Sequence, residues 1–241
     1  MKRSAPAAIL LDFDGLILDT ETPLYTSWQE VCDVHCVPMD HTWWANLLTA
    51  KADPPEAYDL LEQRSSLPFD REQVRTARYA RELQLIEEQA LLPGVAELIS
   101  QARKLALCIG IASNSERAWV TGHLSRLGLL ESIDQIRCRD DVLHPKPCPD
   151  PYLAVLEALG VLPGQAIAFE DSPAGVAAAK AAGVFCVAVP NTVTRGIAFP
   201  GVDLVVSSLA EVSLERLLLS VGIGLSPDAF PDREWGNQEH G

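Results

Sequence analysis

The chain has 241 residues, 48% hydrophobic and 22% charged, a balance typical of a folded protein with room for one large and one small domain. The formal net charge is −14, which disfavours nucleic acid and anionic membranes as partners and would repel a phosphorylated ligand unless its site were locally positive. No apolar run is long enough to span a bilayer, and we expect a cytoplasmic protein without a secretory signal.

The first predicted strand, residues 7–12, ends in carboxylates. Asp12 closes an apolar run and Asp14 follows two positions later, so both side chains point to one side of an extended chain, and Gly15 lets the chain turn away. Charge at the end of a buried strand is costly unless it has a use. The pair could bind a cation, attack an electrophile or transfer a proton.

Residues 20–90 contain no convincing strand and have the pattern of a helical block. Helices are predicted at residues 22–36, 40–51, 56–65 and 70–90, separated by breaks that contain proline. A helical block inserted after the first strand predicts a lid domain, with hinges near residues 15–20 and 88–94. The core domain would then comprise residues 1–19 and 91–225.

Strand and helix patterns alternate beyond this block. Strands are predicted at residues 106–112, 133–138, 166–169, 184–189 and 203–206. Helices are predicted at residues 93–104, 116–127, 149–159, 173–182 and 208–220. The alternation predicts an α/β fold with a Rossmann-like parallel sheet covered on both faces, whose functional side chains belong at the carboxyl ends of the strands. Residues 226–241 lack apolar periodicity, and we expect a mobile tail.

Polar side chains follow several of these strands. Ser113 and Asn114 stand before a helix, where a hydroxyl and free N–H groups could bind phosphate, although both residue types are also common helix caps. Lys146 lies in a loop stiffened by three prolines, which leaves it little freedom to lose on binding, although a loop lysine is ordinarily a solvated charge. Glu170 and Asp171 end another strand, where acids could also be simple helix caps.

A parallel sheet would place Glu170 and Asp171 beside Asp12 and Asp14. Two like charges about 4 Å apart repel by roughly 4 kcal/mol at an effective dielectric constant near 20. A hard divalent cation would relieve this repulsion, and a set of oxygen ligands favours Mg²⁺.

Four motifs in this order resemble the haloacid dehalogenase (HAD) superfamily of phosphohydrolases. They are Asp12-Phe13-Asp14-Gly15 with Asp19-Thr20 after it, Ser113, Lys146-Pro147-Cys148-Pro149-Asp150, and Glu170-Asp171. Within that superfamily the chain is most similar to the β-phosphoglucomutase-like phosphatases of the CbbY/YhcW type. The resemblance implies a Rossmann-like core, an α-helical cap at residues 20–90 and a small phosphorylated metabolite as substrate, such as a sugar phosphate.

The resemblance also implies a role for each motif residue. Asp12 would be the nucleophile that forms an aspartyl-phosphate, and Asp14 the general acid and then the general base. Asp19 would orient the loop after Asp14. For Asp150 we expect a structural role apart from the resemblance, as the cap of the helix that follows it. The Mg²⁺ ligands would be Asp12, the backbone carbonyl of Asp14, Asp171, and Glu170 directly or through water. The phosphoryl oxygens would be held by Ser113, the Asn114 N–H and Lys146.

The cap departs from the mutase pattern. Related β-phosphoglucomutases carry a cap histidine where this chain has Leu24, and their Gly-x-x-Arg type of loop is absent around residues 49–51. Mutase activity is therefore disfavoured, and ester hydrolysis is preferred. Trp44, Thr49 and Lys51 lie in the segment that faces the core site in related enzymes, so they are candidate substrate contacts.

Two alternatives remain beside a Mg²⁺-dependent phosphatase. One is a phosphosugar mutase with an unusual cap, and the other is a non-catalytic protein that binds a phosphorylated ligand on the same fold. Asp12, Asp14 and Lys146 are all retained, which argues against the second. A monomer is the default expectation for capped relatives. The six cysteines are expected to be reduced thiols, and Cys32 and Cys36 are better interpreted as buried helix residues than as a metal-binding pair.

Overall fold

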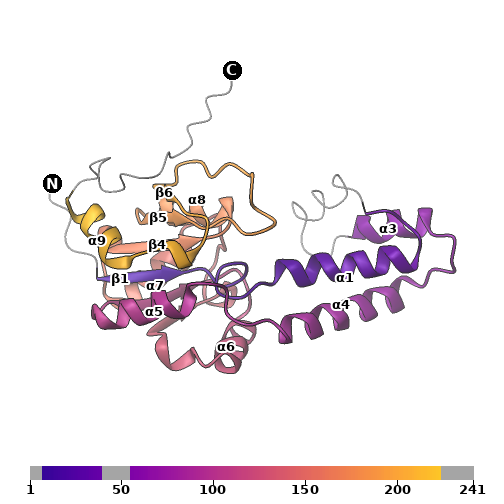
Figure 1. Ribbon diagram of the computed structural model, residues 1–241, viewed down its shortest axis with the longest axis horizontal. Helices are drawn as coiled ribbons and strands as arrows, with labels where there is room; N and C mark the ends of the chain where they lie inside the picture. The colour runs from indigo at the N-terminus through magenta and orange to yellow at the C-terminus, as the bar shows by residue number, and fades with distance from the viewer. Residues whose placement is uncertain (1–6, 40–54, 224–241) are drawn as a thin grey trace, which may run out of the picture.

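The computed structural model describes residues 7–39 and 55–223. A sheet flanked by helices forms one part of the molecule, and an elongated group of helices projects from one end of it (Figure 1). In the described residues, no helix has the length and apolar character needed to cross a membrane.

The sheet has six strands in the order β3-β2-β1-β4-β5-β6, and every neighbouring pair is parallel. The strands are β1 (Ala8–Leu11), β2 (Cys108–Ala112), β3 (Gln135–Arg137), β4 (Ala166–Glu170), β5 (Phe185–Ala188) and β6 (Leu204–Val205). This arrangement confirms the predicted α/β fold with a parallel, Rossmann-like sheet. Strand β1 lies between β2 and β4, with Leu11 aligned to Ile111 on one side and to Phe169 on the other. The ends of these three strands therefore meet at one edge.

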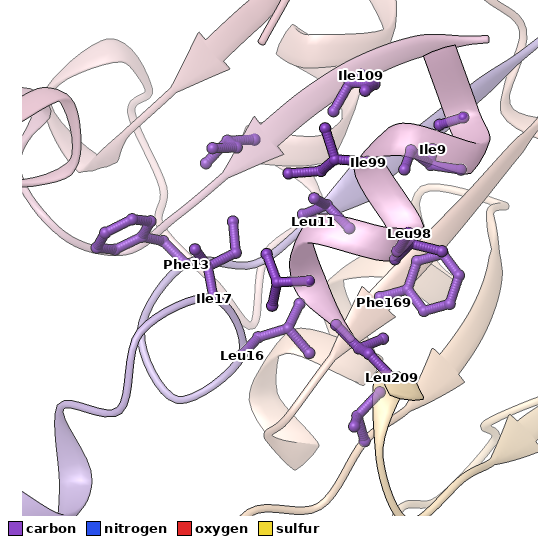
Figure 2. Packing of buried hydrophobic residues seen from close by; sticks show 14 of the residues in the cluster. Ile9, Leu11, Phe13, Leu16, Ile17, Leu98, Ile99, Ile109, Phe169 and Leu209 are labelled. Carbon is purple, nitrogen blue, oxygen red and sulfur yellow. The ribbon is translucent and has the colours of Figure 1, made fainter. Parts of the chain in front are cut away.

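Alternate residues of β1 face two separate hydrophobic clusters, as a strand repeat of two requires. Ile9 and Leu11 belong to a cluster with helices α5 (Val95–Lys104), α6 (Arg117–Arg126) and α9 (Leu214–Ile223). Figure 2 shows part of this cluster, where Leu98 and Ile99 of α5 pack beside these strand residues. On the opposite face, Ala8 and Leu10 pack with α7 (Asp150–Leu159) and α8 (Pro173–Ala181). Both faces of the sheet are thus covered.

The projecting helices have a hydrophobic cluster of their own. Helices α1 (Glu21–Val34), α3 (Pro55–Arg64) and α4 (Arg71–Glu87) supply it, and α1 and α4 lie side by side. Leu24, Trp28 and Cys32 repeat every four residues along the buried face of α1 and meet Tyr58 and Leu61 of α3. The helix predicted at residues 40–51 lies outside the described residues.

One boundary and one burial differ from the sequence predictions for identifiable reasons. The last helix begins at Leu214 and not at residue 208, because Ser208 caps a short 3-10 turn, Leu209–Glu211, through its hydroxyl and the Ala210 N–H (3.2 Å). The prediction that Cys36 is buried is also wrong. Cys36 lies just past the end of α1 and is exposed, whereas Cys32 on the buried face of α1 is enclosed.

Candidate active site

Four buried charged groups meet where β1 and β4 end. Asp12 directly follows β1, and its backbone N–H extends the ladder to β4 by donating to the carbonyl of Phe169 (3.1 Å). Glu170 is the last residue of β4, and Asp171 comes next. One carboxylate oxygen from each of these three acids lies within 4.8 Å of the other two. Lys146 reaches the same cluster from the loop before α7.

Lys146 bridges two of the acids. Its Nζ donates to Asp12 Oδ1 (2.6 Å) and to Glu170 Oε1 (2.5 Å). Burial alone would lower the pKa of Lys146, but the charges of Asp12 and Glu170 outweigh it, so the net pKa is raised and the ammonium is charged. Asn114 fixes this loop, because its Oδ1 accepts from the Lys146 N–H (2.8 Å) and its Nδ2 donates to the Lys146 carbonyl (3.1 Å).

The Glu170 carboxyl is enclosed but incompletely paired. Its Oε1 accepts hydrogen bonds from Lys146 and from the Tyr152 hydroxyl of α7. Among the described residues, its Oε2 has no hydrogen-bond partner. Burial, opposed by Lys146 and reinforced by Asp12, raises the pKa of Glu170 to about 7. An unpaired buried carboxylate oxygen is costly, and a bound cation is a group that would satisfy it.

Asp171 is held from the other side by a residue that the sequence analysis missed. Asn191, in the loop after β5, donates from Nδ2 to Asp171 Oδ2 (2.7 Å). Burial and the charges of Asp12 and Glu170 raise the pKa of Asp171 well above its usual range. Within residues 7–39 and 55–223, these three acids thus face one lysine, Lys146. The excess negative charge and the all-oxygen donor set fit a hard divalent cation.

Asp14 lies outside this group of three acids and contacts helix α6 and the residues before it. Its Oδ2 accepts from the Ser115 hydroxyl (2.6 Å), and its Oδ1 accepts from the Trp119 indole N–H (3.0 Å). Burial raises the pKa of Asp14, and the Ser115 hydrogen bond opposes that effect. Neither donor was predicted from the sequence. Ser115 lies two residues beyond the Ser113 motif, whereas nothing in the spacing of Trp119 indicated a contact.

Ser113 and Asp19 form local backbone contacts. Ser113 is buried after β2, and its hydroxyl accepts from the Ser115 N–H (2.9 Å) within the loop. It does not cap α6, whose N-cap position is Glu116, and phosphate binding by Ser113 stays a prediction. Asp19 Oδ1 accepts from the N–H groups of Glu21 (3.1 Å) and Thr22 (2.9 Å), so it caps the start of α1. Burial, with the charges of Asp14 and Asp19, raises the pKa of Glu21 to about 7, which adds an acid that the sequence analysis overlooked.

Two other expectations end differently. Asp150 does not cap α7: it is the first residue of that helix, and its carboxylate accepts instead from the His144 backbone N–H (3.2 Å) and pairs with the His144 ring (3.0 Å). The candidate cap contacts Trp44, Thr49 and Lys51 lie outside the described residues.

Comparison with known proteins identifies the class of fold and site. The sequence profile of the family described as haloacid dehalogenase-like hydrolase matches residues 9–189, so the chain belongs to this family. Protein YhcW of Bacillus subtilis (strain 168) is 39% identical over 212 residues, which cover 88% of this chain and 96% of YhcW. Validoxylamine A 7'-phosphate phosphatase of Streptomyces hygroscopicus subsp. limoneus is 31% identical over 203 residues, 84% of this chain and 94% of that enzyme.

Solved structures agree. CbbY from Rhodobacter sphaeroides in complex with phosphate superposes with a TM-score of 0.65 at 30% identity, covering 86% of this chain and 96% of CbbY. A CbbY variant in complex with xylulose-(1,5)-bisphosphate gives a TM-score of 0.64 at 29% identity over the same shares of the two chains. The chain is thus a phosphatase, a phosphoric monoester hydrolase that acts on phosphorylated substrates.

Proposed function

We propose that this phosphatase is Mg²⁺-dependent and hydrolyses a small phosphorylated metabolite, a sugar phosphate, through an aspartyl-phosphate on Asp12. The observation that carries the proposal is the buried group of Asp12, Glu170 and Asp171, to which Lys146 is the one lysine bound among the described residues. The bound xylulose bisphosphate of CbbY supports the sugar-phosphate class. A cytoplasmic location and a monomeric state remain predictions, as does the cap domain at residues 20–90.

Four positions would hold the metal: Asp12, Glu170, Asp171 and the backbone carbonyl of Asp14. The unpaired Glu170 Oε2 and the carboxylate excess over Lys146 support this assignment. When bound, Mg²⁺ would neutralise charge on the phosphoryl oxygens and on the carboxylates around them.

Asp12 and Lys146 would act on the phosphoryl group itself. A carboxylate oxygen of Asp12 would form a bond to phosphorus while the bond from phosphorus to the leaving oxygen breaks. Lys146 already holds Asp12 Oδ1 in place and supplies a fixed positive charge beside the transferring oxygens. Ser113 and the Asn114 N–H would contact the same oxygens from the end of β2.

Asp14 would move the protons of both steps. Its protonated carboxyl would donate to the leaving alkoxide, which releases the alcohol and leaves a carboxylate. That carboxylate would then take a proton from water as the water oxygen attacks phosphorus and the bond to Asp12 breaks. The cycle returns free phosphate, free Asp12 and protonated Asp14.

No specific observation favours a mutase. Leu24, which stands where related mutases carry a cap histidine, is buried in the hydrophobic cluster of α1 and α3. A side chain in that cluster supplies no polar group for binding a second phosphorylated position.

The test is a panel of phosphorylated metabolites assayed for phosphate release with Mg²⁺ and after chelation. We expect release only with the metal, and loss of turnover in Asp12→Asn. Full activity of Asp12→Asn would remove the proposed nucleophile, and undiminished activity after chelation would remove the metal. Conversion of a sugar 1-phosphate to its 6-phosphate without free phosphate would identify a mutase.

A further inference from the structure

The two oxygens of the Asp14 carboxyl are held by different donors from one stretch of chain. Ser115 binds Oδ2 at 2.6 Å and Trp119 binds Oδ1 at 3.0 Å. Ser115 stands just before α6 and Trp119 is in its first turn, so one structural element sets both contacts. The carboxyl plane is therefore fixed from outside the group of three acids.

The two donors differ in chemistry. An indole N–H can only donate, so Oδ1 must be an unprotonated acceptor whenever this bond is present. A serine hydroxyl can donate or accept, so it tolerates Oδ2 with or without a proton. The pair of donors thus assigns any proton on Asp14 to Oδ2 and keeps it off Oδ1.

Packing fixes the indole as well. The Trp119 ring meets His123, one turn further along α6, edge to face with 4.3 Å between ring centroids. The His123 ring is stacked in turn on the ring of Phe13, with 6.4 Å between the ring centroids. Phe13 is the residue between Asp12 and Asp14 in the sequence. The indole N–H is aimed by neighbours that are themselves buried and packed.

We propose that Trp119 is a positioning residue for catalysis, which orients the Asp14 carboxyl and directs its transferable proton to Oδ2. The proposal rests on the proposed acid–base function of Asp14. Trp119 touches neither phosphate nor metal in this scheme and acts only through Asp14.

Trp119→Phe tests the proposal because it removes the N–H and keeps an aromatic ring against His123. We expect kcat for an alkyl phosphate to fall about tenfold or more, with KM little changed, since general acid–base catalysis contributes about 10²- to 10⁴-fold in total. The loss should be smaller for phosphoryl transfer from p-nitrophenyl phosphate, measured in single turnover, because nitrophenolate leaves without protonation. The alkyl phosphate used is the one that the metabolite panel shows to be turned over fastest.

Thr121→Val is the matched control, since the Thr121 hydroxyl is also a donor on α6, bound to the backbone carbonyls of Arg117 (2.8 Å) and Ala118 (3.5 Å). It should leave kcat and its dependence on the leaving group unchanged. A melting temperature for each variant shows whether the fold is retained. If Trp119→Phe does not fold, Ser115→Ala removes the other donor and should produce the same leaving-group dependence.

A double-mutant cycle separates positioning from general structural damage. In an Asp14→Asn background, Trp119→Phe should have no further effect on kcat, because its target is already absent. An equal fold-loss in both backgrounds, or wild-type kcat of Trp119→Phe on the alkyl phosphate, would overturn the inference while Asp14 keeps its role. If Asp14→Asn itself retains wild-type turnover of the alkyl phosphate, the proposed function fails first and the inference with it.

Discussion

Asn191 is joined to Asp171 by a hydrogen bond of 2.7 Å, and its other side-chain atom is anchored in its own loop. Asn191 Oδ1 accepts from the backbone N–H groups of Val193 (2.8 Å) and Thr194 (2.9 Å), which leaves Nδ2 free to point only at the carboxylate. The amide therefore sets the direction of one acid in the candidate metal site. Groups that orient metal ligands in this way commonly change metal affinity by about 10- to 100-fold when they are removed.

We expect Asn191→Ala to raise the Mg²⁺ concentration for half-maximal activity by about tenfold. Asn191→Asp should raise this Mg²⁺ concentration further, because the aspartate keeps the acceptor for the loop N–H groups but places a carboxylate oxygen against Asp171. Titration calorimetry with Mg²⁺ alone checks the effect without substrate. Gln165→Ala, which removes an acceptor for the Leu162 N–H, is the control. Unchanged Mg²⁺ affinity in both Asn191 variants would contradict the prediction.

Gly175 makes a second prediction about the same group of acids. A Cβ built on Gly175 would lie 1.8 Å from Glu170 Oε2, closer than any real contact, so even alanine must displace that carboxylate. We expect Gly175→Ala to reduce phosphatase activity by about tenfold or more through lost transition-state charge stabilisation. A phosphatase assay measures this loss, and the melting temperature shows whether the variant remains folded.

Gly122 supplies the matched control for that substitution. It lies within α6, and a Cβ there would meet nothing within 4 Å. Gly122→Ala should therefore stabilise the fold by about 0.5–1 kcal/mol, as alanine does in a helix interior, and leave activity unchanged. If the two alanine variants had the same activity, the close approach of Gly175 to Glu170 would not be required for catalysis.

The sequence was sufficient to predict that the three acids and the lysine share one site, because the topology of the sheet brings them together. Asp12, Glu170 and Asp171 lie at the carboxyl ends of neighbouring strands of a parallel sheet, so their side chains must meet at one edge whatever the details of packing. Lys146 could be predicted as a site residue because of its proline-rich motif. These positions depend on strand order and not on the rotation of any helix.

The residues that orient this group could not be predicted in the same way. Trp119 reaches Asp14 only because α6 presents that face, and Asn191 reaches Asp171 because its loop folds back after β5. Tyr152, which donates to Glu170, stands at an apolar position of α7 and resembles an ordinary core residue. For Asp150 the sequence predicted a role that the structure does not show. An acid at the start of a helix is typical of a cap, but the Asp150 carboxylate pairs with the nearby His144 instead.

Thiol chemistry gives a prediction that depends on pKa. Burial raises the pKa of Cys32 and of Cys138 to about 12, and burial also raises the pKa of Cys186. Because thiolate is the reactive form, a pKa of about 12 leaves roughly 10⁻⁴ of such a thiol ionised at pH 8, and moderate alkalinity changes little. Cys36 and Cys148 are exposed.

We therefore expect Cys36 and Cys148 to be alkylated at pH 8 in the native protein, and Cys32, Cys138 and Cys186 to react only after unfolding. Peptide mass spectrometry after iodoacetamide treatment, with and without guanidinium, distinguishes the two groups. Rapid native labelling of Cys138 would show that the face of the sheet near α6 opens more readily than its burial implies.

Arg126 connects the core to the chain that returns from the projecting helices. Its guanidinium donates to the backbone carbonyls of Ile86, Glu87 and Gln89 at distances of 2.9–3.3 Å, just where α4 ends. These carbonyls lie at or just past the last turn of α4, so a fixed cation there both caps α4 and ties it to α6. Arg126 thus restrains the connection between the two parts of the molecule.

Arg126→Met keeps the length and apolar stem of the side chain and removes all of these bonds. We expect it to lower the free energy of unfolding by about 1–2 kcal/mol and to speed amide hydrogen exchange at residues 86–92. Arg103→Met is the matched control, because Arg103 likewise binds a carbonyl, that of Ser132, and pairs with Asp134, but it does so within the core. Arg103→Met should destabilise the protein without a selective rise in exchange at residues 86–92. Equal exchange there in both variants would mean that the connection is held by packing and not by the guanidinium of Arg126.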